Sequence, residues 1–244
     1  MIDLHCHMLP GLDDGAPDLS VSLAMARMAV ADGIVTTACT PHILPGVYPN
    51  NGPDIRDAVA DFAAELEAAE IPLTLEVGAD VHLDPGLLLG LRNGSVPTLG
   101  VSRYFLLEPP HHSIPPKLDE LAFGFVTAGY YPILTHPERL SWIEGQFDVV
   151  LRMAASGVLI QLTAGSVLGQ FGRRAQYWAE RMLDENLADL LASDGHNLER
   201  RPPVLAGARE ATAKRCGDAT ATRLVATNPL AILQNVLPWK LRQP

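Results

Sequence analysis

Cysteine is scarce in this sequence, with Cys6, Cys39 and Cys216 as the only three among 244 residues. They lie far apart along the chain and are odd in number. Such a distribution does not suggest a disulfide framework, and it suits a reducing compartment. The fold must therefore be stabilised by its hydrophobic core, for which a hydrophobic content of 48% provides ample material.

Positive charge is in the minority. The chain has 18 Lys and Arg against 28 Asp and Glu, a formal net charge of −10, and a pI of about 5.2. This balance argues against a nucleic-acid partner, which would require a basic surface. It does not exclude an anionic substrate, because bound cations can reverse the local sign of the potential.

Long uninterrupted apolar runs are also lacking. The longest apolar stretch, around residues 23–37, is broken by Arg27 and Asp32 and cannot span a bilayer. No basic segment followed by an apolar one precedes Asp3 and His5, so no signal peptide is expected. We therefore expect a cytoplasmic protein without direct membrane insertion. With no repeat or linker evident, we expect a single domain over residues 1–244.

Short β-rich runs alternate with helical patterns along most of the chain. Helices are expected from Ser20, as N-cap, to Gly33, from Pro53-Asp54 to just before Pro72, after Pro115-Pro116, from about 173 to 186, and as two or three segments after Pro202, the last opening at Asn228-Pro229. The seven strand candidates are residues 2–7, 34–39, 73–78, 104–108, 132–136, 158–162 and 190–193.

This alternation predicts parallel βα units. A doubly wound open sheet would fit the same pattern. A closed, TIM-like barrel is favoured because polar residues collect at the carboxyl ends of many different strands, where barrels place their sites.

The polar residues at the strand ends are histidines and acids. In a strand, alternate side chains share a face, so His5 and His7 can point to the barrel axis while Cys6, a packing thiol, faces the helices. Asp194 and His196 repeat this spacing at the last strand, next to the first in a closed barrel. The strand-end set comprises His5, His7, Asp13, Asp14, His42, Asp80, Glu108, His136, Asp194 and His196.

A mixture of imidazole and carboxylate donors suits manganese, iron or zinc better than calcium or magnesium. The donors exceed what one tetrahedral ion needs, so two or three divalent ions are expected. Asp13 and Asp14 are adjacent and cannot easily both bind, and the residues alone leave that choice open. The other histidines, His82, His111 and His112, are expected outside the inner set, with the last two near the mouth of the cleft.

Two arginines follow the strand ends closely. Arg139 comes three residues after His136, and Arg201 follows His196, although the adjacent Arg200 fits the spacing equally well. Guanidinium groups beside a metal cluster favour an anionic substrate, above all a phosphate ester.

A thiol nucleophile for phosphate-ester hydrolysis is excluded. Such enzymes need a cysteine followed, six positions later, by an arginine of the phosphate loop. The sixth residues after the three cysteines are Leu12, Pro45 and Thr222. Any phosphatase chemistry must therefore proceed through metals.

Taken in order, these motifs resemble those of a known superfamily. The opening residues 3–15, with His5-Cys6-His7, resemble the start of the polymerase-and-histidinol-phosphatase (PHP) superfamily. More narrowly, the chain is similar to the bacterial manganese-dependent tyrosine phosphatases of capsule and exopolysaccharide operons. The further matching segments are Thr40-Pro41-His42, 103–108, His136-Pro137-Glu138-Arg139, 192–197, Arg201-Pro202-Pro203 and Asn228-Pro229.

The resemblance implies a distorted (β/α)7 barrel of the PHP fold with three metal ions, most often manganese. It selects Asp14 over Asp13 as a ligand, and Arg201 over Arg200 as the partner of Arg139 in holding phosphate. The implied ligands are His5, His7, Asp14, His42, Asp80, Glu108, His136, Asp194 and His196. One departure is Asp80, where these phosphatases usually carry a metal-bridging Glu that is longer by one methylene.

The implied function is hydrolysis of phosphotyrosine on protein, with an autophosphorylated tyrosine kinase of capsular or exopolysaccharide synthesis as substrate. His42 is a candidate proton donor in that reaction. A PHP-type phosphatase for a small molecule, such as histidinol phosphate, is the nearest alternative. A hydrolase of amide or ester bonds is disfavoured by the arginine pair. A non-catalytic regulator that binds a phosphoprotein is the alternative from another class.

Overall fold

The computed structural model describes residues 1–241. Its helices and strands alternate along nearly the whole chain. In order they are β1 (Ile2–Cys6), α1 (Leu19–Ala31), β2 (Thr36–Cys39), β3 (His42–Ile43), α2 (Gly52–Ala68), β4 (Thr74–Val77), β5 (Asp80–His82), α3 (Leu87–Asn93), β6 (Tyr104–Glu108), α4 (Leu118–Thr127), β7 (Tyr131–Leu134), the 3-10 turn η1 (Pro137–Arg139), α5 (Ile143–Ala155), β8 (Leu159–Thr163), α6 (Ala164–Val167), α7 (Gly172–Asp184), β9 (Leu190–Ala192), α8 (Ala206–Cys216), α9 (Asp218–Thr222), the π-helical η2 (Arg223–Thr227), α10 (Asn228–Leu233) and α11 (Pro238–Leu241).

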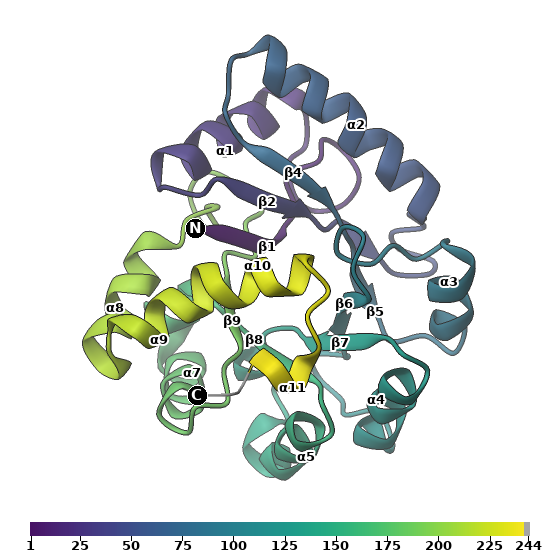
Figure 1. Ribbon diagram of the computed structural model, residues 1–244, viewed down its shortest axis with the longest axis vertical. Helices are drawn as coiled ribbons and strands as arrows, with labels where there is room; N and C mark the ends of the chain where they lie inside the picture. The colour runs from purple at the N-terminus through teal and green to yellow at the C-terminus, as the bar shows by residue number, and fades with distance from the viewer. Residues whose placement is uncertain (242–244) are drawn as a thin grey trace.

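All the strand pairs are parallel and follow one another around a ring. The pairings run β1-β2-β4 in one sheet and β3-β5-β6-β7-β8-β9 in the other. A parallel bridge between Cys6 and Gly195 returns the ring to β1, and the amide of Asp194 donates to the carbonyl of His5 at 2.8 Å. Helices surround the strands on the outside (Figure 1).

β2 and β3 are two halves of one kinked strand, as are β4 and β5. Cys39 pairs with Val77 and His42 pairs with Asp80, so the register between the two chains is the same on both sides of the kink. The kinks fall at Thr40-Pro41, where proline has no amide to donate, and at Gly78-Ala79. A Cβ on Gly78 would lie 2.8 Å from Leu99. Counted this way the ring has seven strands, and the predicted distorted (β/α)7 barrel is confirmed.

Two hydrophobic clusters show which face each strand residue takes. Leu106 lies with Leu4 and Ile133 in the smaller cluster, which fills the barrel interior. Phe105 and Leu107, the alternate residues of β6, lie in the larger cluster between strands and helices. This alternation is the period of two expected for a strand. Since Glu108 follows Leu106 by two residues, it points to the barrel axis.

The first strand changes face part-way along. Leu4 belongs to the interior cluster but Cys6 belongs to the outer one, although two residues normally return a strand to the same face. The pairing of β1 with β2 contains a register shift between Asp3 and Cys6. A bulge of this kind re-aims the following side chains. The result is that His5 and His7 both face the carboxyl end of the barrel, while Cys6 faces the helices as predicted.

Several helices differ from the sequence-based expectation. Asp18, not Ser20, is the N-cap of α1, because its Oδ1 accepts from the amide of Val21. Ser20 lies inside the helix and donates to Asp18. The short α3 and the longer α5 were not expected, and in the tail α10 begins at Asn228 as predicted but is followed by α11.

The carboxyl-terminal helices cover the barrel at the amino ends of its strands. α10 and α11 lie across the front of the ring in Figure 1. Ile232 and Leu241 pack in the interior cluster with Ile2, and the hydroxyl of Tyr104 donates to the carbonyl of Val236. The opposite end, where the strands finish, is left for the polar residues.

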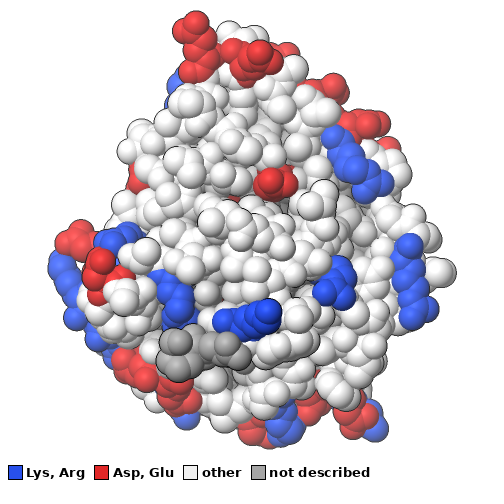
Figure 2. Space-filling view, in the orientation of Figure 1, with Lys and Arg blue, Asp and Glu red and all other residues white. Residues whose placement is uncertain are grey.

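Charges on this covered face are mixed. Figure 2 shows Lys and Arg as separate clusters at the rim and across the lower half of this face, with Asp and Glu among them, and they form no continuous basic surface there. Within residues 1–241, no helix is both long enough and apolar enough to cross a membrane.

Candidate metal centre

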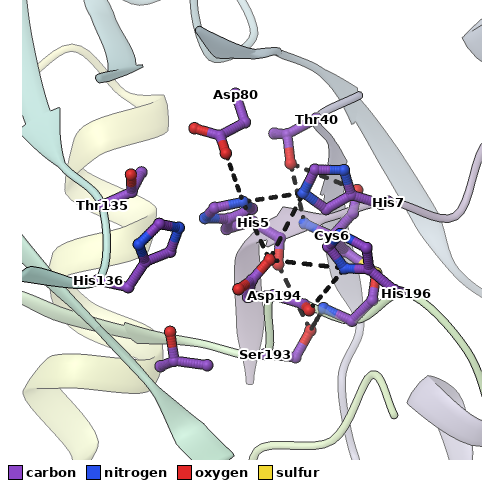
Figure 3. A network of polar contacts seen from close by, with 12 residues as sticks. His5, Cys6, His7, Thr40, Asp80, Thr135, His136, Ser193, Asp194 and His196 are labelled. Carbon is purple, nitrogen blue, oxygen red and sulfur yellow. Dashed lines mark hydrogen bonds and ion pairs between the residues drawn. The ribbon is translucent and has the colours of Figure 1, made fainter. Parts of the chain in front are cut away.

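Histidines and acids from most strands converge at the carboxyl end of the barrel. β1 contributes one histidine, the segment after it a second histidine and one acid, β3, β5 and β6 one residue each, and the loops after β7 and β9 the rest. All nine residues of the predicted ligand set lie here: His5, His7, Asp14, His42, Asp80, Glu108, His136, Asp194 and His196. Figure 3 shows the inner part of this arrangement.

The distances between these donor atoms can be compared with hydrogen-bond lengths and with the spacing of ligands around a metal ion. Nε2 of His5 lies 3.4 Å from Oδ2 of Asp80 and 3.4 Å from Oδ1 of Asp194. These separations are too long for good hydrogen bonds. They match the edges of a coordination polyhedron, since metal–ligand bonds of about 2.0–2.2 Å place neighbouring ligands about 3.0–3.5 Å apart. Such separations allow one cation to contact several of these donor atoms.

The innermost group contains His5, His7 and Asp80, whose donor atoms all lie within 4.8 Å of one another. Oδ1 of Asp194 completes it, at 3.4 Å from His5 and 3.5 Å from His7. The side chains of the four residues are 1% exposed or less. A second group beside it contains His7, Asp14, His42 and His196.

Glu108 lies between two further groups of donors. Its Oε2 is 3.5 Å from Nδ1 of His42 and 2.6 Å from Nε2 of His82. Its Oε1 is 3.2 Å from Nε2 of His111 and 3.6 Å from Nε2 of His136. His82 and His111, which the sequence placed outside the inner set, therefore both contact a predicted ligand. His112 is exposed, as expected for the cleft mouth.

Outer hydrogen bonds orient the inner histidines. Nδ1 of His5 donates to Gln161 at 2.8 Å, and Nδ1 of His7 donates to Asp13 at 2.7 Å. Nδ1 of His196 donates to the carbonyl of Asp194. In each case Nε2 is left as the free donor, which is how proteins commonly fix a metal-binding imidazole.

The structure places Asp13 and Asp14 in different positions. Asp13 accepts from His7, from the amide of His42 at 2.9 Å and from the amide of Gly15, so it is both a turn residue and a support for His7. Asp14 points to His42 and His196, at 3.5 and 3.4 Å. This geometry favours Asp14 over Asp13 as a ligand.

The pKa shifts of the acids and histidines in the centre indicate that added positive charge would stabilise it. Burial raises the pKa of Asp80, and the neighbouring Glu108 raises it further. Burial alone would lower the pKa of His5, but the carboxylates of Asp80 and Asp194 outweigh it and raise that pKa to about 9. A hydrogen bond from His196 lowers the pKa of Asp14 to about 2. Several buried acids thus share one small volume, and a cation there would be strongly stabilised.

Unpaired buried atoms test whether the site fits metal ions. Among the residues that the structure describes, both carboxylate oxygens of Asp80, Nδ1 of His42, Nδ1 of His136 and Nε2 of His196 are buried without a hydrogen-bond partner. Buried polar atoms without partners are costly and rare in native proteins. Divalent ions would satisfy them together, so the donor set fits metal.

Two ligand candidates adopt an unusual backbone conformation. His136 has φ 35° and Asp194 has φ 52°, both in the left-handed region. Residues other than glycine seldom occur there, and when they do they cluster at functional sites. Each residue lies two positions after the end of a strand, so the turn aims its side chain back over the end of the barrel.

Two arginines border the metal centre. Arg139 and Arg201 both contact Oδ2 of Asp194, whose other oxygen faces the histidines. Arg139 lies with its guanidinium 4.4 Å from the ring centroid of Phe171. Arg200 is exposed, whereas the carbonyl of Arg201 accepts from the amide of His196 at 2.7 Å. Arg201, rather than Arg200, thus lies at the centre. The cationic side chains of Arg139 and Arg201 border the donor atoms.

The cysteines are unsuited to nucleophilic attack. Cys6 and Cys39 are fully buried, and burial raises the pKa of each thiol well above its usual value. Burial also raises the pKa of Cys216, which lies on α8. Since the thiolate is the reactive form, thiol catalysis is not supported at any of the three.

His82 and Gln161 contact the predicted ligands Glu108 and His5, and the alternation of side chains along their strands could have predicted this. His82 follows Asp80 by two residues on β5 and so shares its face, and Gln161 is the middle residue of the buried strand β8. A buried amide in an otherwise apolar strand is a signal of a polar partner. His111 had no comparable signal, because it lies in a loop.

The fold and the site together define an α/β-barrel protein with a histidine and carboxylate centre able to bind divalent metal ions. The chain belongs to the family described as capsular polysaccharide synthesis, CpsB/CapC, which matches residues 1–234.

Named relatives support this assignment. The chain is 34% identical over 201 residues to the tyrosine-protein phosphatase YwqE of Bacillus subtilis (strain 168), which covers 82% of this chain and 79% of that protein. It is 31% identical over 205 residues to the putative tyrosine-protein phosphatase CapC of Staphylococcus aureus, covering 84% and 80%. It is 26% identical over 242 residues to the tyrosine-protein phosphatase CpsB of Streptococcus pneumoniae, covering 97% and 100%.

Solved structures agree. One, described as YwqE from Bacillus subtilis and CpsB from Streptococcus pneumoniae, unique metal-dependent tyrosine phosphatases, matches with a TM-score of 0.92 and 32% identity over 96% of this chain and 95% of that one. More distant structures, such as a lactonase from Listeria monocytogenes and the phosphotriesterase from Mycobacterium tuberculosis, match with TM-scores of 0.55 and 0.53 at 13% and 12% identity. These two share the fold alone.

Proposed function

We propose that this chain is a metal-dependent phosphatase that hydrolyses phosphotyrosine on protein. The observation that carries the proposal is the position of Asp194, which links the donor cluster through one oxygen to two arginines through the other. A phosphate group bound next to Asp194 would lie between the metal ions on one side and the two arginines on the other. The relatives named as tyrosine-protein phosphatases support this choice of substrate.

The metal cofactor is proposed to be two or three divalent ions, with manganese preferred over iron or zinc. The predicted ligand set is proposed to hold them, because its donor atoms fall into adjoining groups that share residues such as His7 and Glu108. When bound, such ions polarise phosphoryl oxygens and make water a competent nucleophile at neutral pH.

The arginines hold the substrate in this scheme. Arg139 and Arg201 bind non-bridging phosphate oxygens and neutralise charge as it shifts in the transition state. The ring of Phe171 packs against the guanidinium of Arg139 and helps to hold it in place. Asp194 keeps the two guanidinium groups near each other before substrate arrives.

The leaving group needs little help. Tyrosinate has a parent pKa of about 10, so its departure is easier than that of an alkoxide from serine. His42 faces carboxylates with both of its ring nitrogens, Asp14 at Nε2 and both Asp80 and Glu108 at Nδ1. We therefore propose His42 as a ligand first, and assign protonation of the leaving group to solvent.

The physiological substrate is proposed to be an autophosphorylated tyrosine kinase of capsular or exopolysaccharide synthesis. The family description supports the process. The acidic composition supports a protein partner rather than nucleic acid. The proposed compartment is the cytoplasm.

Side-by-side turnover tests the substrate class. The purified chain, stripped with a chelator and reloaded with Mn²⁺, is given a phosphotyrosine peptide, a phosphoserine peptide of the same sequence and histidinol phosphate. We expect kcat/KM for the phosphotyrosine peptide to exceed the other two by at least about 100-fold, a difference of roughly 2.7 kcal/mol in transition-state stabilisation. Preference for histidinol phosphate would contradict the proposal in favour of the small-molecule alternative. Tight binding of phosphotyrosine without turnover would favour the non-catalytic regulator.

A further inference from the structure

We propose that His111 is a metal ligand, which together with Glu108 and His136 holds one divalent ion at the outer edge of the centre. The three residues offer donor atoms that all lie within 4.8 Å of one another. The inference rests on the metal centre of the proposed function but not on its substrate. In this proposal His111, which lies in a loop, takes a coordination position on the outer ion that Asp80 does not occupy.

Asp80 is directed elsewhere. Its Oδ2 lies 3.4 Å from His5 and 3.4 Å from Nδ1 of His42, and its donors group with His5 and His7. In Figure 3 a dashed line joins Asp80 to His5, while His136 lies to the left of His5 with no marked contact to Asp80. Among the described residues, no group of three or more donors within 4.8 Å of one another combines Asp80 with Glu108 or His136. An ion on Glu108 and His136 therefore needs another protein donor.

The imidazole of His111 is in position to be that donor. Its Nε2 is 3.2 Å from Oε1 of Glu108, and its ring centroid is 5.2 Å from that of His136. Glu108 is 4% exposed and His136 2% exposed, and Nδ1 of His136 is buried without a hydrogen-bond partner among the described residues. Besides the imidazole of His111, this group of donors thus contains a buried nitrogen that lacks a partner.

The loop that carries His111 is tied down. The amide and hydroxyl of Ser141 both donate to the carbonyl of His111, at 2.9 and 3.0 Å. The indole of Trp142 donates to the carbonyl of Pro110 at 3.0 Å. Ser141 and Trp142 follow Arg139 closely, so the loop is anchored to the segment that also carries the proposed phosphate-binding arginine. A ligand needs this kind of fixed position.

His82 is assigned a different role. It contacts the other oxygen of Glu108, at 2.6 Å, and its donors group with His42 rather than with His111. At 2.6 Å, Nε2 of His82 and Oε2 of Glu108 are at hydrogen-bond distance, whereas two ligands of one ion lie about 3.0–3.5 Å apart. His82 then acts on Glu108 as an orienting partner, and His111 as the ligand.

Manganese counting tests the assignment. The chelator-stripped full chain and its variants are dialysed against Mn²⁺ at about ten times the Kd of the parent's weakest site, and bound metal is measured per chain. We expect His111→Ala and His111→Asn to bind one ion fewer than the parent. The asparagine variant retains a hydrogen-bond donor to Glu108, so it separates ligation from hydrogen bonding. His112→Ala, at the exposed neighbour, is the matched control and should bind the parent's number.

The inference is overturned if His111→Asn binds as many ions as the parent, with affinities within tenfold. Thermal unfolding of the metal-free proteins checks that each variant folds. A second measurement needs no variant. Anomalous scattering from crystals of the parent grown with Zn²⁺ should place an ion about 2.1 Å from a nitrogen of His111. An ion bound to Glu108 and His136 but beyond bonding distance of His111 would contradict the inference. Neither readout depends on phosphatase turnover.

Discussion

Asp13 illustrates how much a residue outside the ligand set can matter. Burial alone would raise its pKa, but hydrogen bonds from His7 and from backbone amides lower it well below the usual value. The ionised carboxylate fixes the tautomer of His7 and makes the ring a better donor to a cation.

Removing this support should weaken one metal site. We expect Asp13→Ala to raise the Kd of the Mn²⁺ ion bound through His7 by about 10–100-fold. Asp13→Asn should have a smaller effect, because the amide oxygen can still accept from His7. Isothermal titration calorimetry measures both. Equal affinities for parent and alanine variant would show that Asp13 does no more than shape the turn.

The charge state of His5 predicts a proton linked to metal binding. Its pKa in the metal-free fold is about 9, above the ordinary 6.5, so the ring is protonated at neutral pH. A metal ligand must be neutral imidazole, and binding must displace that proton. Mn²⁺ affinity should therefore rise with pH, by up to tenfold per unit below about pH 9. Calorimetry in buffers of different ionisation enthalpy should detect about one proton released at pH 7. No release at that pH would contradict the assignment of His5.

At the scale of single residues, the sequence could predict which histidines and acids gather at the strand ends. It could not decide between Asp13 and Asp14, because their roles depend on a turn whose geometry involves His7 and His42. Nor could it place His111, since a loop carries no periodicity from which a direction can be read.

At the scale of elements, the turn after β1 determines how the first ligands are presented. A Cβ on Gly15 would lie 2.1 Å from the carbonyl oxygen of His7 and 2.6 Å from its Cβ. These atoms belong to backbone or sit next to it, so they cannot move aside cheaply. The turn therefore packs directly against the strand that carries His5 and His7.

We predict that Gly15→Ala destabilises the metal-free protein by at least about 1–3 kcal/mol and weakens Mn²⁺ binding. The control is Gly124→Ala in α4, where a Cβ would meet nothing within 4 Å. That exposed change should be neutral or stabilise by about 0.5–1 kcal/mol, the advantage of alanine over glycine in a helix. Urea unfolding compares the two. Equal stabilities for the two variants would contradict the close contact.

The seven predicted strands match the structure to within about two residues, because their buried runs are rich in apolar residues and end at polar ones. β3 and β5, the short continuations beyond the kinks, were not predicted. The bulge in β1 was not, since it depends on pairing with β2, whose register is set by the whole ring. α3 was missed because Pro85 and Gly86, just before it, read as a turn. The N-cap of α1 was misplaced by two residues because Asp18 and Ser20 are both good capping residues.

At the scale of the whole molecule, one end of the barrel stabilises the fold and the other holds the candidate metal centre. The amino end is packed with apolar residues and closed by α10 and α11, while the carboxyl end holds the charged centre. Tyr104 starts β6 at the closed end and Glu108 ends it at the polar end. The four residue steps from Tyr104 to Glu108 correspond to a rise of about 13 Å along the strand.

This separation predicts that stability and metal binding can be changed independently. Tyr104→Phe removes the hydrogen bond to the carbonyl of Val236 and should destabilise the fold by about 1–2 kcal/mol. Mn²⁺ affinity should stay within twofold of the parent. Tyr177→Phe, at a side chain that is 57% exposed, is the control and should change neither quantity. A large loss of Mn²⁺ affinity in Tyr104→Phe would show that the two ends are coupled.

Hydrolysis of a phosphotyrosine peptide tests most directly whether the donors and arginines at the carboxyl end form a metal-dependent phosphatase site. The chelator-treated parent should be inactive and should recover on addition of Mn²⁺. His136→Ala and Arg139→Ala, shown to be folded, should lose at least about 100-fold in kcat/KM at saturating Mn²⁺, whereas His112→Ala should match the parent. If the chelated parent keeps its activity, or the two site variants hydrolyse the peptide as fast as the parent, the assignment of this site is wrong.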